Sequence, residues 1–165
     1  MSIDASFRST GIVIREETNY EFYIITNKMT KKQSVDKLIN YREYNKNDDK
    51  TQSLNNYIDV LQKIIDETHP DKILIEDTAF VSNSRSTVDL GILQGAIRAL
   101  AHFNRIPIHP INNQTWKKEV LGNAGIDKEY TVMSFKRLQP QFKDYTTSQI
   151  NDLADSFMIS LYNAI

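Results

Sequence analysis

The sequence SQINDLADSFMISL, spanning Ser148–Leu161, carries the pattern around which we interpret the rest of the chain. Its apolar residues recur at helical spacing and predict a helix with a broad apolar face: Ile150, Leu153, Ala154, Phe157, Met158 and Leu161. Asp152 and Asp155 interrupt this helix three residues apart, so both carboxylates lie on one face. The pair is either a solvated polar edge or part of a divalent-metal site, since such ions prefer carboxylate oxygens.

Composition predicts a single globular domain over residues 1–165, because the apolar fraction of 40% and the charged fraction of 25% are ordinary. No apolar run is long enough to span a bilayer. Asp4 and Arg8 lie where the hydrophobic core of a signal peptide would be. The chain has no cysteine, which excludes disulfides and thiolate metal sites. We therefore expect a cytoplasmic protein with no membrane partner.

Short strands joined by turns are predicted near the beginning of the sequence. Three segments are apolar or β-branched and are separated by turn residues, so they predict an antiparallel meander: Ser2–Phe7, Gly11–Ile14 and Tyr20–Thr26. Asp4 lies on the first of these strands. Residues 28–50 are polar and contain only one brief candidate strand, at Leu38–Tyr41.

Helices and strands then alternate along the chain. Apolar residues repeat at helical spacing from Leu54 to Ile65, and the compact run Lys72–Ile75 fits a buried parallel strand. This strand ends in Glu76, and α/β sheets tend to place their sites at the carboxyl ends of such strands. The remaining elements are a long helix within residues 83–104, a strand at Ile106–Pro110, a helix up to Leu121 and a helix over Asp127–Leu138.

A meander followed by βαβ units is the element order of the ribonuclease H-like fold. We therefore predict an α/β protein with a mixed five-stranded sheet flanked by helices. That fold carries acidic residues on its first strand, its fourth strand and its last helix. Asp4, Glu76 and the pair Asp152 and Asp155 occupy these places. This agreement favours the metal site over a solvated helix edge.

At these residues the chain resembles the RuvC family of Holliday junction resolvases. IDASFRSTG at residues 3–11 is similar to the family's first motif, although Ala5 and Ser6 stand where the family has Pro-Gly. Ile75-Glu76 followed by LGILQG at residues 90–95 resembles the second motif, and DLADS at residues 152–156 resembles the last. The loose agreement between motifs indicates a phage-type member, which would act in the host cytoplasm.

The resemblance implies a crossover junction endodeoxyribonuclease that resolves Holliday junctions and other branched DNA. Its site would bind two Mg²⁺ ions, with Mn²⁺ as a substitute, through four carboxylates: Asp4, Glu76, Asp152 and Asp155. Two-metal sites activate a water and stabilise the departing oxygen. The expected products are symmetric nicks with 5′-phosphate and 3′-hydroxyl ends.

The DNA surface is expected on the segment from Ser84 to Lys143, where nine basic residues outnumber four acidic ones for a net charge of +5. In the resemblance, Lys117 matches a functional lysine before Gly122, and Lys128 matches a second one after it. The same surface is expected to include an aromatic residue that stacks on an unpaired base and two further basic residues: Phe80, Lys118 and Arg85.

The resemblance also implies a homodimer through the helix that contains Gly91 and Gly95, since small residues permit close helix approach. Two alternatives are a ribonuclease H-type or flap nuclease of the same fold, and a catalytically silent protein that binds junctions. Metal-dependent cleavage of a synthetic four-way junction separates all three.

Overall fold

One mixed sheet organises the computed structural model, which describes residues 1–77 and 85–162. Its strand order is β4-β3-β2-β1-β5-β6. The strands are β1 (Ser2–Asp4), β2 (Ser9–Glu16), β3 (Asn19–Thr26), β4 (Asn40–Glu43), β5 (Ile73–Asp77) and β6 (Ile108–Asn112). β1, β2 and β3 form the predicted antiparallel meander. β5 pairs parallel with both β1 and β6, as expected for βαβ units.

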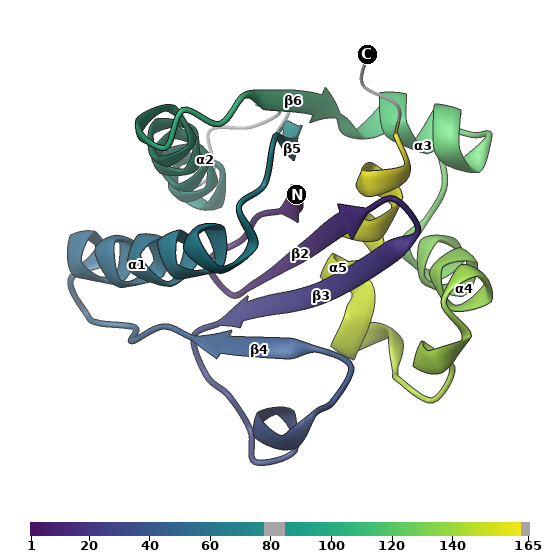
Figure 1. The fold of residues 1–165 in the computed structure, drawn as a ribbon, viewed down its shortest axis with the longest axis horizontal. Coiled ribbons are helices and arrows are strands. Elements are labelled where there is room, and N and C mark those ends of the chain that lie inside the picture. Colours follow the sequence, from purple (N-terminus) through teal and green to yellow (C-terminus); the bar gives the residue numbers. More distant parts are fainter. Residues whose placement is uncertain (78–84, 163–165) are drawn as a thin grey trace.

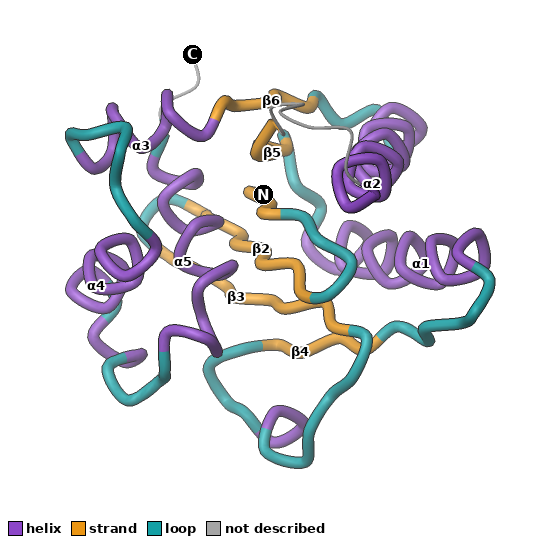
Figure 2. Tube along the Cα trace, turned by 180° about the vertical axis from the view of Figure 1, so that it is seen from behind, coloured by secondary structure: helices purple, strands orange, loops and turns teal. Residues whose placement is uncertain are grey.

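Helices cover both faces of this sheet. They are α1 (Lys50–Thr68), α2 (Arg85–Phe103), α3 (Asn113–Leu121), α4 (Lys128–Leu138) and α5 (Thr147–Leu161). Figures 1 and 2 show α1 and α2 on one side of the sheet and α3, α4 and α5 on the other. Within the described residues, no helix combines the length and apolar character needed to cross a membrane.

The prediction of five strands is wrong by one, because β4 adds a sixth strand parallel to β3. It lies in the polar region 28–50 and overlaps the brief candidate strand at Leu38–Tyr41, which the predicted sheet did not include. Ile39, Tyr41 and Tyr44 are buried there, while the residues between them are exposed or half-buried. A short edge strand surrounded by polar residues shows too brief an alternation to establish that it joins the sheet.

Alternating side chains divide the hydrophobic interior into two cores. On β3, Phe22 and Ile24 join the core under α3, α4 and α5. Tyr23 and Ile25 point the other way and join the core under α1 and α2. This is the period of two expected for a strand that is covered on both faces.

The close approach of α5 to β1 and β2 decides where its aspartates lie. Ser156 on α5 donates its hydroxyl to the Ser2 carbonyl over 2.8 Å. A Cβ atom at Gly11 on β2 would stand only 2.2 Å from the Asp152 carbonyl oxygen. The absence of a side chain at Gly11 therefore allows α5 to cross directly over the strand that pairs with Asp4.

Candidate active site

Four acidic side chains lie within electrostatic range of one another near the carboxyl ends of β1 and β5. These strands are parallel, with Ile3 opposite Ile75, so the following residues Asp4 and Glu76 emerge side by side. Gly11 pairs with Asp4 and contacts α5 at Asp152, which brings the helical aspartates to the same edge. The structure thus brings together the four carboxylates that the sequence singled out.

Burial raises the pKa of three of these groups, and repulsion from neighbouring carboxylates adds to the shift at two of them. Burial is the main cause at Asp4, whose pKa is raised well above its usual value with added contributions from Asp155, Glu76 and Asp152. Burial and then the charge of Glu76 raise the pKa of Asp155 to about 7. The pKa of Asp152 is raised by burial and partly restored by Ser9, Lys128 and Arg8.

Positive charge near the site offsets only part of this repulsion. Lys128 lowers the pKa of Asp4, Asp152 and Asp155, and Lys117 lowers that of Asp155. The salt bridges formed among the described residues involve other acidic side chains. Among the described residues the four carboxylates therefore form no salt bridge, and their oxygen donors fit a hard divalent cation.

The arrangement of the side chains is less compact than a finished metal site. Among the described residues, no three His, Asp or Glu side chains are grouped closely enough to share one ion as they lie. Like-charged carboxylates repel one another, and a bound cation reverses that repulsion.

Glu76 is also held by neighbours that the sequence analysis did not assign to the site. The Asn113 amide donates to one carboxylate oxygen over 2.9 Å, and the Trp116 indole N–H donates to the other over 3.0 Å. The Gln94 amide donates to the Glu76 main-chain carbonyl over 2.7 Å. The only sequence signal for these contacts is position: Asn113 and Trp116 follow β6, and Gln94 lies on the helix that follows β5.

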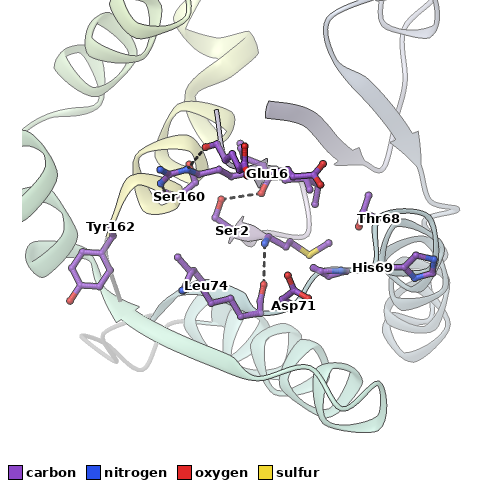
Figure 3. Close-up of a pocket in the computed structure, with 15 residues that line it drawn as sticks. Ser2, Glu16, Thr68, His69, Asp71, Leu74, Ser160 and Tyr162 are labelled. Atoms are coloured by element: carbon purple, nitrogen blue, oxygen red, sulfur yellow. Dashed lines mark hydrogen bonds between the residues drawn. The ribbon is translucent and has the colours of Figure 1, made fainter. Parts of the chain in front are cut away.

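A cavity of about 380 Å³ opens beside Asp4 and Glu76 and is also lined by Gln94 and Asn113. A larger cavity of about 620 Å³ lies at the opposite ends of the strands, near the start of β1. Figure 3 shows this second cavity, with Ser2 and Leu74 near Ser160 and Tyr162. None of the four carboxylates lines it, so its size does not identify it as the reaction site.

The residues predicted to contact DNA differ in how exposed they are to solvent. Lys128 and Lys118 are exposed, at the start of α4 and on α3. Lys117 is half-buried, and its ammonium donates to the Ile126 carbonyl over 3.0 Å. Phe80 lies outside the described residues. Arg85 begins α2, but its side chain is not among the described ones.

Asp155→Asn is expected to stabilise the metal-free protein at neutral and alkaline pH. The pKa of Asp155 is raised to about 7 in the folded chain, above the ordinary value of 3.8 for an aspartate. Ionisation of Asp155 therefore opposes folding increasingly as the pH rises from about 4 to about 7. The free energy of unfolding of the variant should exceed that of the wild type by on the order of 2–4 kcal/mol at about pH 8, and the difference should vanish near pH 4. Urea unfolding in chelator at several pH values measures it, and a gain independent of pH would contradict this assignment.

An acidic cluster at the carboxyl ends of β1 and β5, next to basic side chains, is the arrangement expected of a nuclease with the ribonuclease H-like fold. The family model described as crossover junction endodeoxyribonuclease RuvC matches residues 1–162. The chain belongs to the RuvC family.

Individual relatives agree with this membership. RuvC of Chlamydia caviae is 24% identical over 117 residues, which are 71% of this chain and 69% of that protein. RuvC of Gluconobacter oxydans is 32% identical over 80 residues, 48% of each chain.

Solved structures of Thermus thermophilus RuvC confirm the predicted fold class. The structure of that protein alone has a TM-score of 0.64 at 14% identity and covers 96% of this chain and 89% of its own. Its complex with a Holliday junction substrate has a TM-score of 0.67 at 13% identity, covering 96% and 88%.

Proposed function

We propose that this protein resolves four-way DNA junctions as a divalent-metal-dependent endonuclease. The observation that carries the proposal is the convergence of four carboxylates at the carboxyl ends of β1 and β5, where burial and neighbouring carboxylates raise the pKa of Asp4 and Asp155. The RuvC family match over residues 1–162 supports the junction as the substrate. The proposed setting is the cytoplasm, and a phage origin stays a prediction.

Asp4 is proposed as the central ligand of two Mg²⁺ ions, for which Mn²⁺ can substitute. The charges of Asp155, Glu76 and Asp152 all raise the pKa of Asp4, which places Asp4 within reach of the other three carboxylates. Glu76 would then serve one ion, and Asp152 and Asp155 the other. Bound divalent ions supply Lewis-acid stabilisation of the phosphate and an activated water.

Cleavage of a synthetic four-way junction tests the function directly. We expect paired, symmetric nicks with 5′-phosphate ends in Mg²⁺ or Mn²⁺ and none in chelator. Forked DNA, linear duplex and an RNA–DNA hybrid of matched sequence serve as competing substrates. Cleavage of the hybrid alone would favour the ribonuclease H-type alternative. Junction binding without cleavage in either metal would favour a silent binding protein.

Lys128→Ala is expected to weaken junction binding and to reduce the salt dependence of binding by about one unit of slope. The Lys128 side chain is exposed, and its charge reaches three of the carboxylates, so it stands where phosphate must approach. Binding measured across a salt series tests this. Lys63→Ala, an exposed lysine on α1, is the matched control. If the slope of log affinity against log salt concentration is the same in both variants, Lys128 does not contact the DNA.

The proposed homodimer uses the outer face of α2. Its exposed apolar side chains lie on one stripe, with Val88 57%, Ile92 52% and Phe103 81% exposed, and Gly95 lies between them at helical spacing. Contiguous exposed apolar surface of this kind is typical of interaction sites. A two-fold dimer would present two sites with the symmetry that paired nicks require.

Gly95→Arg is expected to give a folded monomer that nicks junctions without coordination. No atom lies within 4 Å of a Cβ at this position, so the change should leave the protomer intact and block only a partner helix. Sedimentation measures the oligomeric state, and Met133→Arg on α4, also exposed, is the control. A wild-type monomer that still makes paired nicks would contradict the dimer.

A further inference from the structure

We propose that Asn113 and Trp116 are positioning residues that orient the Glu76 carboxylate for divalent-metal binding, so that the emission of Trp116 reports on that binding. This inference rests on the proposed metal-dependent function. It concerns residues of α3 that carry no carboxylate and that contact neither ion nor DNA in the proposed mechanism.

The pairing of β5 with β6 places these residues beside Glu76. Glu76 lies opposite Ile111 and Asp77 opposite Asn112, so the chain leaves β6 directly next to the carboxylate. The Asn112 side chain accepts from the Gln114 backbone N–H over 2.9 Å and so caps α3. Asn113 is then the first helical residue, and Trp116, three residues later, lies on the same face.

Together the two side chains engage both oxygens of Glu76. Asn113 Nδ2 donates to Oε1 over 2.9 Å and Trp116 Nε1 donates to Oε2 over 3.0 Å. Hydrogen bonds to an ionised acceptor are stronger than neutral ones and define its orientation. Each carboxylate oxygen has a second lone pair, so the donors fix the plane of the group and leave coordination sites free.

Packing makes Trp116 a rigid donor. Its side chain is 0% exposed and belongs to the same hydrophobic core as Leu153 and Ala154 of α5, the residues that separate Asp152 from Asp155. The indole N–H can only donate, and leaving it unpaired in this interior would be unfavourable. The core therefore fixes the ring, and the ring fixes Glu76 relative to the helix that carries the other carboxylates.

Metal affinity without DNA provides the first test, by calorimetric titration of the purified protein with Mg²⁺ and with Mn²⁺. Loss of an outer-shell partner typically weakens binding by about 10–100-fold. We therefore expect Trp116→Phe and Asn113→Ala each to lower affinity by about 10-fold, in folded protein checked by circular dichroism. Thr115→Ala, an exposed change on the same helix, should match the wild type. Asn113→Ala does not remove core volume, so it separates positioning from packing.

Fluorescence provides the second test, because Trp116 is the single tryptophan of the chain. Saturating Mn²⁺ or Mg²⁺ should change its emission with the affinity that calorimetry reports. Glu76→Gln should remove that emission change, because a neutral amide binds a divalent ion much more weakly than a carboxylate does. Arg42→Ala changes a half-buried residue of β4 that is distant in sequence from Trp116. This control should preserve the emission change.

The outcomes separate this inference from the proposed function. If the wild type binds metal and cleaves junctions while both variants bind with wild-type affinity and emission is constant, the positioning role is overturned and the function stands. If the wild type binds no divalent ion and cleaves nothing, both proposals are overturned. Reduced affinity in both variants with a metal-dependent emission supports both.

Discussion

Asp4→Asn is expected to slow cleavage of a four-way junction by at least about 1,000-fold, because a bound divalent ion contributes several kcal/mol to the transition state. Asp4 is the carboxylate whose pKa all three others raise, so its replacement should disturb both ions. Removing one negative charge from a crowded acidic cluster should not weaken the fold or the approach of phosphate. Junction binding should therefore survive.

Single-turnover cleavage and gel-shift binding on the same junction measure the two effects separately. Glu76→Gln, Asp152→Asn and Asp155→Asn should behave in the same way. Asp59→Asn removes one charge from the exposed face of α1 and serves as the control. A wild-type cleavage rate in Asp4→Asn would remove this residue from the site and with it the proposed arrangement of ions.

The parts of the fold that periodicity encodes could be predicted from the sequence. The apolar run Lys72–Ile75 predicts the strand that the structure places at Ile73–Asp77, because Ile73, Leu74 and Ile75 are buried between the two layers of helices. The last helix shows two like charges on one face of an otherwise apolar pattern. Both signals are local, and the known order of elements in the fold was enough to bring them together.

Contacts that depend on strand register could not be predicted in this way. Asn113 and Trp116 reach Glu76 because β6 lies parallel to β5 with Glu76 opposite Ile111. Nothing in the local composition of residues 113–116 specifies that register. Arg8 is a similar case, since it lies in the turn after β1 and its charge acts on Asp152, 144 positions later in the chain.

Gly11 shows how a correct local interpretation can miss the physical cause. The sequence predicts a strand that begins at Gly11, and the structure places Gly11 within β2, where it pairs with Asp4 and Ile24. Its φ is not among the positive values of the described residues. The glycine is needed for space, because the backbone of α5 occupies the position of a side chain.

Gly11→Ala is therefore expected to destabilise the protein by about 3 kcal/mol, at the upper end of overpacking effects, and to abolish junction cleavage. The added Cβ would lie 2.2 Å from the Asp152 carbonyl oxygen, 2.4 Å from its carbon and 2.7 Å from the Leu153 nitrogen. All three are backbone atoms, so relief requires α5 to move and to carry Asp152 and Asp155 away from Asp4. Urea unfolding measures the loss. Gly95→Ala, where no atom lies within 4 Å of the new Cβ, should instead stabilise the helix by about 0.5–1 kcal/mol. Equal stability of Gly11→Ala and the wild type would show that α5 does not cross β2 this closely.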